Sequence, residues 1–193
     1  TGIYSKEPLV WYQLMKLMAD ARESVQIHTP YAVMGGDMYD GIRRVAQTVP
    51  ETSMMINAVE TGDNFVASSD YIFNKRKLTE TGVKLLEFVG DKSYHGKSIV
   101  VDHRLAIVGS YNMDLRSTYM DTELLLAVDC PSIAKQLEDN MRVFENQAKQ
   151  VIISEEDEVA YANDDLIIDE MPWYKKVAMR ITGFFLQPIR YVV

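Results

Sequence analysis

Short apolar runs alternate with longer amphipathic stretches over the first ninety residues, and this order restricts the fold more than any other feature. Apolar residues recur with helical spacing over residues 9–21, 37–45 and 67–81. The runs expected to form strands cover residues 25–27, 54–59 and 83–89. Strands that alternate with helices pair in parallel, because each helix returns the chain to the edge where the next strand begins. The sequence therefore predicts an α/β domain, in which Asp37 would cap the second helix.

The spacing changes after residue 95, where short apolar runs follow one another with short links at residues 97–101, 105–109 and 123–128. Short links join antiparallel strands, so we expect these runs to be neighbours in the same sheet. Residues 133–151 then predict a long helix with polar residues on its exposed side. The expected fold is α/β, with a mixed, largely parallel β-sheet flanked by helices on both faces, in one lobe over residues 1–153.

Charge is distributed unevenly along the chain, whose formal net charge is −8. Residues 154–170 contain eight acids and no lysine or arginine, which predicts an acidic linker over residues 154–171. Residues 172–193 contain four basic residues and no acid. The body that remains is mildly acidic, which argues against a protein that binds a nucleic acid duplex through a basic face.

The basic segment 172–193 predicts an amphipathic C-terminal arm. One helical stripe contains Trp173, Val177, Ile181, Phe184 and Phe185, and the helix would be weakened or bent at Gly183 and Pro188. Two alternatives remain open: a helix docked on a protein lobe, or an interfacial helix with its apolar face in lipid. The second alternative predicts a peripheral, membrane-associated protein. The sequence has no run of about 18 apolar residues, the length that a helix needs to span a bilayer.

Cysteine and histidine usage excludes several site types. The single cysteine, Cys130, rules out a disulfide framework and a cysteine-rich metal site. The histidines, at positions 28, 95 and 103, do not have the spacing of zinc ligands. The chain begins with Thr1, so we expect it to be a fragment of a longer protein or a processed chain.

Residues 93–114, SYHGKSIVVDHRLAIVGSYNMD, predict a β-hairpin with polar residues at its open end. A two-residue turn at His103 and Arg104 would place Lys97 opposite Ser110 and His95 opposite Asn112. Directly opposed residues share one face of a sheet, so these four side chains would form one polar cluster. Asp102 would point away from it or cap the turn. A register shift of one residue would separate the cluster.

This cluster has the side chains needed to bind a phosphoryl group and react with it. Lys97 supplies positive charge, while Ser110 and Asn112 supply neutral donors. His95 can act as a nucleophile or as a proton donor near neutral pH.

The hairpin resembles the phospholipase D superfamily. His95-Gly-Lys97 followed after four residues by Asp102 matches its H-x-K-x4-D signature, the HKD motif, and Gly109-Ser110-x-Asn112 and Glu123 follow at the usual distances. More narrowly, YHGKSIVVD, GSYNMDLRS and DTELLL resemble the bacterial cardiolipin synthase and phospholipase D-like group. The resemblance implies the fold of one lobe of such an enzyme, with this catalytic set: His95, Lys97, Asp102, Ser110, Asn112 and Glu123.

The chemistry implied by the resemblance is that of a phosphodiesterase or phosphatidyltransferase without a metal or other cofactor, acting on an anionic phospholipid. One histidine attacks phosphorus to form a phosphohistidine, and a second protonates the leaving alcohol. An acid such as Glu123 orients the histidine, and Asp102 is largely structural. Whether His95 is the nucleophile or the general acid stays open, as does the choice between water and an alcohol as acceptor.

The family needs two such motifs at one site, and this chain has one. His28 is followed by Thr-Pro and no lysine, so it is not the second copy. We therefore expect a second HKD lobe as partner, from an upstream part of the protein or from a second chain. The alternatives are a dimeric nuclease of the same superfamily with one motif per chain, and an isolated lobe that is inactive alone.

Overall fold

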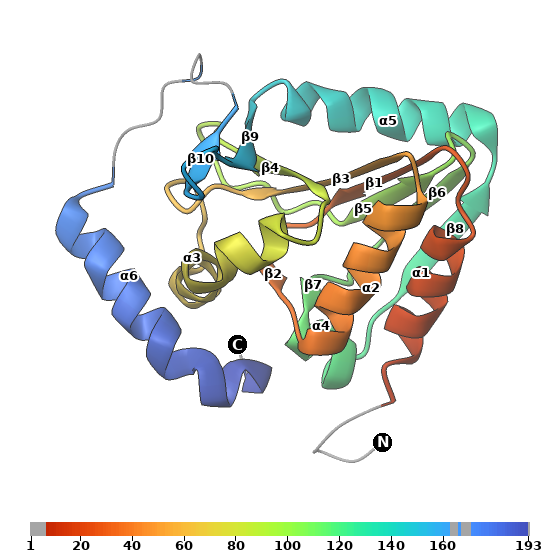
Figure 1. Ribbon diagram of the computed structural model, residues 1–193. Coiled ribbons are helices and arrows are strands. Elements are labelled where there is room, and N and C mark those ends of the chain that lie inside the picture. Colours follow the sequence, from red (N-terminus) through yellow and green to blue (C-terminus); the bar gives the residue numbers. More distant parts are fainter. Residues whose placement is uncertain (1–6, 163–165, 167–170, 193) are drawn as a thin grey trace.

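The computed structural model describes residues 7–162, 166 and 171–192, which contain a mixed eight-stranded sheet with helices on both faces (Figure 1). The strand order in this sheet is β10-β9-β4-β3-β1-β5-β6-β8. Its strands are β1 (Ser24–His28), β3 (Glu51–Asn57), β4 (Lys84–Phe88), β5 (Ser98–Val101), β6 (Leu105–Gly109), β8 (Leu125–Asp129), β9 (Ala148–Ile153) and β10 (Val159–Tyr161). A separate short pair consists of β2 (Ala32–Val33) and β7 (Met113–Asp114).

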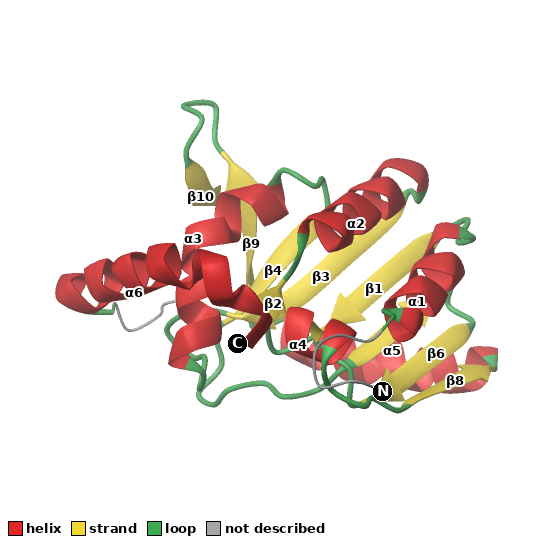
Figure 2. Cartoon of the chain, turned by 90° about the horizontal axis from the view of Figure 1, so that it is seen from below, coloured by secondary structure: helices red, strands yellow, loops and turns green. Residues whose placement is uncertain are grey.

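The helices are α1 (Leu9–Ala19), α2 (Gly36–Thr48), α3 (Phe65–Thr79), α4 (Leu115–Tyr119), α5 (Pro131–Glu145) and α6 (Trp173–Leu186), and a 3₁₀ segment, η1 (Gln187–Val192), follows α6. In the described chain no helix is both long and apolar enough to cross a bilayer. Seen from below, α1, α2 and α4 lie in front of the sheet and α5 lies behind it (Figure 2).

The predicted mixed α/β sheet is confirmed, with a smaller parallel part than expected. Strands β1, β3 and β4 pair in parallel, because α2 and α3 provide the crossovers between them. The remaining described neighbours in the large sheet, including the predicted β5, β6 and β8, pair antiparallel.

The sheet buries its two faces differently. On β1, Val25 and Ile27 face the main core with α1 and α2, while the alternate residues Ser24, Gln26 and His28 face α5. Fully burying an aliphatic side chain such as Ile27 stabilises the fold by about 1.5–3 kcal/mol. The α5 face therefore carries polar groups along β1, and the opposite face carries most of the core.

The predicted helix over residues 133–151 is wrong in its C-terminal part. Helix α5 ends at Glu145, and Ala148–Ile153 forms strand β9 instead. This segment pairs antiparallel with β4 and buries Ala148 and Val151. Its run Val-Ile-Ile favours a strand, because β-branched side chains lose little freedom on a pleated sheet.

The acidic segment is only partly linker in the described residues. Strand β10 pairs with β9 across a turn in which Asp157 has a φ of 62°. Residues 163–165 and 167–170, which hold the other four acids of the predicted linker, lie outside the described residues. The prediction that Asp37 caps α2 is also wrong: Gly35 is the N-cap, and Asp37, in the first turn, accepts a hydrogen bond from Tyr119 Oη at 2.6 Å.

Helix α6 and η1 are attached to the lobe rather than separate from it. Arg190 of η1 donates from Nε and a terminal nitrogen to the two carboxylate oxygens of Asp70 in α3, at 2.6 and 2.8 Å. The Asp70 side chain is fully buried, and Gln187 also donates to it at 3.3 Å. A buried, bidentate ion pair of this kind fixes orientation, because either charge left alone would be costly to bury.

Candidate functional site

Three of the predicted site residues lie at the same edge of the sheet. Lys97 immediately precedes β5, Ser110 immediately follows β6, and Glu123 lies two residues before β8. Antiparallel pairing brings these strand ends together. Two backbone hydrogen bonds extend the sheet there, from Gly109 N to Lys97 O at 3.3 Å and from Ser110 N to Leu124 O at 3.0 Å.

The hairpin register differs by one residue from the prediction. Val101 pairs with Leu105 and Ser98 with Val108, so the turn contains three residues, 102–104, rather than two. Asp102 and His103 both have positive φ, 50° and 53°. Aspartate tolerates this left-handed conformation better than most residues. The predicted two-residue turn is therefore wrong.

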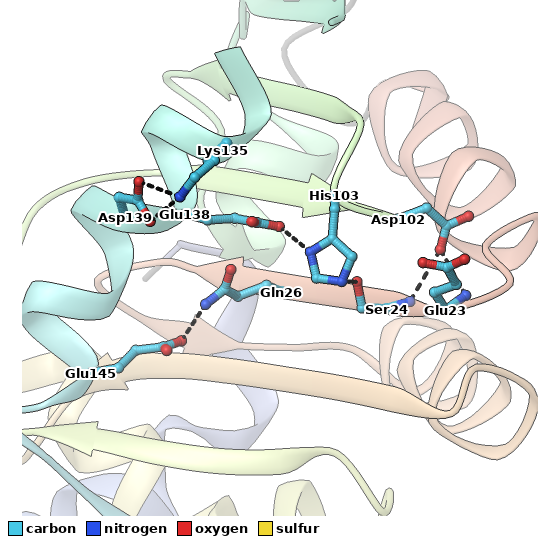
Figure 3. A network of polar contacts seen from close by, with 9 residues as sticks. All are labelled: Glu23, Ser24, Gln26, Asp102, His103, Lys135, Glu138, Asp139 and Glu145. Atoms are coloured by element: carbon cyan, nitrogen blue, oxygen red, sulfur yellow. Dashed lines mark hydrogen bonds and ion pairs between the residues drawn. The ribbon is translucent and has the colours of Figure 1, made fainter. Parts of the chain in front are cut away.

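The Asp102 carboxylate explains the wider turn. It accepts hydrogen bonds from the backbone N–H groups of Arg22, Glu23 and Ser24, at 2.8–3.1 Å, and joins the α1–β1 loop to the hairpin (Figure 3). Burial alone would raise the pKa of Asp102, but these N–H donors hold it below its usual value. Asp102 thus lies at the opposite end of β5 from Lys97, in a structural position.

The predicted single-face cluster does not form by regular strand pairing. The paired part of the hairpin stops at Ser98 and Val108, and the polar residues lie beyond it. His95 and Lys97 are nevertheless in contact: Lys97 Nζ lies 3.0 Å from His95 Nδ1 and donates to the His95 carbonyl oxygen at 2.9 Å. The loop geometry, rather than the strand register, brings the site residues together.

Lys97 lies within electrostatic reach of three carboxylates. Burial lowers the pKa of its ammonium group, while the charges of Asp114, Glu123 and Asp63 act in the opposite direction. Each of these acids has a neutral partner: Ser110 for Glu123, Asn112 for Asp114 and Tyr31 for Asp63. The structure therefore arranges His95, Lys97, Ser110, Asn112 and Glu123 in one neighbourhood.

Ser110 is the partner of Glu123 in this structure. Its hydroxyl donates to the Glu123 carboxylate and accepts from Leu124 N at 3.1 Å. Within the described chain, the His95 ring contacts Lys97 and Tyr31 rather than Glu123. The close approach of the two segments requires glycine before Ser110, because a Cβ on Gly109 would lie 2.1 Å from the Leu124 carbonyl oxygen.

The loop that carries His95 is held by Asn57, a buried residue at the end of β3. Asn57 Oδ1 accepts from Tyr94 N at 2.8 Å, and its Nδ2 donates to Tyr94 O at 2.8 Å. The same Nδ2 also lies 3.2 Å from the Pro30 carbonyl oxygen. The side chain of Asn57 thus pairs with Tyr94 as a neighbouring strand would, and fixes the backbone immediately before His95.

Tyr31 and Asp63 form a second contact around His95. The rings of Tyr31 and His95 meet edge to face, with centroids 6.0 Å apart, and Tyr31 Oη donates to Asp63 Oδ1 at 2.6 Å. This hydrogen bond lowers the pKa of Asp63, and the charge of His95 acts in the same direction.

Sequence patterns alone did not single out Asn57 or Asp63. Both lie at or beyond the end of β3, and Tyr31 follows β1, its parallel neighbour. Side chains after parallel strands meet at the carboxyl edge of a sheet, and this rule was a usable signal. The same rule covers Tyr31, which lies three residues beyond the end of β1.

Asp114 has two neighbours of different kinds. It caps α4 by accepting a hydrogen bond from Ser117 N at 2.6 Å. Burial raises its pKa. The same carboxylate lies within electrostatic reach of Lys97, so the cap also belongs to the site's surroundings.

His28 lies behind the site and is buried. Its Nε2 is 3.1 Å from Glu145 Oε1 and its Nδ1 is 3.3 Å from Tyr94 Oη. It does not supply a second exposed imidazole beside His95. Among the described residues no group of three or more His, Cys, Asp or Glu side chains is arranged to hold a metal ion. What the site offers is one exposed imidazole beside one ammonium group, with hydroxyl and amide donors near them.

Comparisons with known proteins identify the family and the fold. A family model described as "Cardiolipin synthase, PLD-like domain" matches residues 14–144. Cardiolipin synthase A of Buchnera aphidicola subsp. Acyrthosiphon pisum (strain Tuc7) is 26% identical over 185 residues, which cover 94% of this chain and 34% of that protein. The chain thus spans about a third of the length of the first curated relatives it matches.

Two solved structures share the fold. Phosphatidylserine synthase from Haemophilus influenzae Rd KW20 superposes with a TM-score of 0.72 at 15% identity, over 93% of this chain and 44% of that chain. Nuc, a phospholipase D family member from Salmonella typhimurium, gives 0.58 at 17% identity, over 73% of this chain and 90% of that one. At these identities the likeness concerns the fold alone.

Proposed function

Since the chain belongs to the phospholipase D-like family of cardiolipin synthase domains, we propose that it supplies one half of a phosphodiester-transfer site acting on anionic phospholipids. The observation that carries the proposal is the contact between the exposed His95 and Lys97, beside the Ser110–Glu123 pair. A second HKD lobe, from elsewhere in the protein or from a second chain, supplies the other histidine.

The reaction proceeds in two displacements. In the first, one histidine attacks phosphorus, the P–O bond to the leaving alcohol breaks, and the other histidine donates a proton to that oxygen. In the second, water or an alcohol gives its proton to that histidine, its oxygen bonds to phosphorus, and the P–N bond of the phosphohistidine breaks to release the first histidine. His95 takes one of the two roles. Lys97, Ser110 and Asn112 hold the non-bridging oxygens, where charge stabilisation contributes most to phosphoryl transfer.

The electrostatics support a half-site. Lys97 shares its surroundings with Asp63, Asp114 and Glu123, so the attraction of this lobe for a phosphodiester anion is weakened. A second lysine from the other lobe would offset more of this negative charge. We therefore expect the 193-residue chain to show no turnover by itself while it remains a monomer.

An apolar groove beside the site is our proposed contact for the second lobe. It lies between α1 and β8, has a volume of about 390 Å³, and is lined by Leu9, Leu14, Leu17, Leu124 and Glu123 among others. Leu124 is 80% exposed. Exposed apolar surface of this kind marks interaction sites, and this one borders the half-site that needs completion.

The test is His95→Ala in the intact protein, with His103→Ala as the matched control. His103 is an exposed histidine in the turn at the other end of the hairpin. We expect His95→Ala to abolish both phosphatidyl transfer and phospholipid hydrolysis, and His103→Ala to keep them. Full turnover by His95→Ala would overturn the proposal. A parallel assay for DNA cleavage tests the dimeric nuclease, which predicts His95-dependent cleavage of DNA and no reaction of phospholipid.

A further inference from the structure

Helix α6 presents its apolar side to solvent. Trp173, Tyr174, Val177, Ile181, Phe184 and Phe185 are all exposed, with Trp173 at 77% and Phe184 at 61%. At 3.6 residues per turn, these six side chains fall within an arc of about 120°. A helix on the surface of a globular protein ordinarily turns such an arc inward, toward the core.

The side of α6 that faces the protein buries only a few residues. Met179 and Gly183 are its buried residues, and they pack against α3. A Cβ on Gly183 would lie 2.3 Å from the Ser69 carbonyl oxygen and 3.0 Å from Phe73 Cβ, so the two helices meet at a glycine.

Two contacts fix the rotation of α6 about its axis. The first is the close approach at Gly183, and the second is the buried Arg190–Asp70 ion pair just beyond the helix. Turning the apolar arc inward would break both of them. The outward direction of the arc is therefore a property of the folded lobe. Figure 1 shows that α6 itself lies at the margin of the molecule.

The charges on α6 indicate what covers this arc. Lys175, Lys176 and Arg180 are exposed, and the helix contains no acid. By helical spacing, Arg180 and Lys176 border one side of the arc and Lys175 borders the other. An apolar strip between basic borders is complementary to a bilayer surface with anionic headgroups, with Trp173 and Tyr174 suited to the interface between lipid and water.

We propose that the outer face of α6 lies on an anionic phospholipid bilayer, with its apolar arc below the headgroups and its basic borders among them. The inference rests on the proposed function in one respect: it explains how a site for phospholipids is held close to its substrate. The other exposed apolar surface, the α1–β8 groove, borders the half-site. We therefore assign the groove to the second lobe and the outer face of α6 to lipid.

Trp173 provides a direct probe. The chain has two tryptophans, and Trp11 is 2% exposed in the core. On adding vesicles of phosphatidylglycerol and phosphatidylcholine to the 193-residue chain, we expect a blue shift of emission and quenching by brominated acyl chains. Trp173→Phe removes this signal. Vesicles of phosphatidylcholine alone are expected to give little binding. A folded chain without a Trp173 response to the anionic vesicles, or with equal responses to both, would overturn the proposal.

Two sets of variants test the face itself. Replacing Lys175, Lys176 and Arg180 together by Gln should weaken binding to the anionic vesicles roughly hundredfold, since each basic residue near such a surface contributes about fivefold. The double change Val177→Asp and Phe184→Asp should abolish binding. Val143→Asp is the matched control, because Val143 is an exposed apolar residue of α5 on the other face of the sheet. Equal loss in this control would contradict the assignment to α6.

The two proposals fail separately. His95→Ala should leave vesicle binding unchanged, whereas Val177→Asp with Phe184→Asp should leave turnover of a dispersed short-chain phospholipid unchanged in the intact protein. Loss of lobe pairing in the second variant, measured by mass in solution or by loss of that turnover, would show that a protein lobe covers α6 and would overturn the membrane assignment.

Discussion

Each end of the β5–β6 hairpin carries a histidine next to charged residues, but the two ends make different contacts. The open end has His95 beside Lys97, and the turn end has Asp102 and His103. At the open end strand pairing stops, so side chains are free to surround an exposed imidazole. At the turn end each polar group is used to connect elements. A signature that spans the whole hairpin therefore contains one structural half and, under the proposed function, one chemical half.

The turn end is a junction of three elements. Asp102 accepts hydrogen bonds from two backbone N–H groups of the α1–β1 loop and from that of Ser24 at the start of β1. His103 Nδ1 lies 2.6 Å from Glu138 Oε1 of α5, and its Nε2 lies 3.4 Å from Ser24 Oγ (Figure 3). At the open end, Gly109 N donates to the Lys97 carbonyl oxygen at 3.3 Å, and the described residues show no set of three backbone donors on Lys97 like that on Asp102. The backbone of the motif is therefore held at the Asp102 turn. This turn lies about 15 Å along the strand from the end that carries His95 and Lys97, at roughly 3.3 Å per residue.

The largest expected effect belongs to the open end. Lys97→Met keeps the length of the side chain and removes its charge, so we expect kcat of the intact protein to fall by about 10²–10³ with little change in melting temperature. Lys135→Met, at an exposed lysine of α5 near the turn end, is the control. Equal loss of kcat in both variants would remove the contrast between the two ends.

A smaller effect is expected for the residue that positions the open end. Asn57→Ala leaves the N–H and C=O of Tyr94 without their partner, which should lower kcat by about 10- to 100-fold and stability by about 1–3 kcal/mol. Asn74 is the control, because it is also buried and donates to the Asp70 carbonyl oxygen, away from His95. If Asn74→Ala lowered kcat as much at equal stability, Asn57 would have no positioning role.

Substitutions at the turn end should lower the free energy of unfolding and leave kcat unchanged. Asp102→Ala removes a carboxylate that caps three N–H groups in a largely open position, so we expect a loss of about 1 kcal/mol in the free energy of unfolding, measured by urea denaturation. Asp102→Asn should lose less, because its amide oxygen still accepts and asparagine tolerates positive φ. A tenfold fall in kcat of the folded Asn variant would place Asp102 with the chemistry instead.

The smallest expected effect is the pH dependence of the contribution that Asp102 makes to stability. Because the folded-state pKa of Asp102 is lowered, its contribution to stability is present above the unfolded value of about 3.9 and is lost as the pH falls through the folded value. The stability difference between the wild type and Asp102→Asn should therefore hold from neutral pH to about pH 5 and shrink below about pH 4. A difference that stays constant down to pH 3 would contradict the ionic role of this cap.

The sequence predicted local chemistry better than geometry. The contact between His95 and Lys97 follows from their spacing, and the mixed sheet follows from the order of apolar runs. The register did not, because the left-handed turn depends on N–H donors of the α1–β1 loop, about 80 residues away, as the separation between Arg22 and Asp102 shows. Asn57 and Asp63 were missed for the same reason: parallel crossovers, rather than local patterns, bring them to His95.

The C-terminal segment shows another limit. Its stripe of apolar residues was visible in the sequence, but two contacts on the opposite side of the helix decide which way it points. These contacts are made by Gly183 with Ser69 and by Arg190 with Asp70, both on α3, and the sequence of the segment alone does not reveal them. A helical pattern alone does not say whether its apolar side faces protein or lipid.

The buried Asp70–Arg190 pair also imposes an order in time. Asp70 is separated from Arg190 by 120 residues, so at ordinary rates of protein synthesis it leaves the ribosome roughly ten seconds before its partner. Throughout that interval α3 carries a carboxylate that cannot be buried as an ion without its counter-charge. Burial of ionised Asp70 on α3 therefore becomes favourable only after η1 has been made, so the last segment of the lobe to be synthesised stabilises the packing of a helix made much earlier.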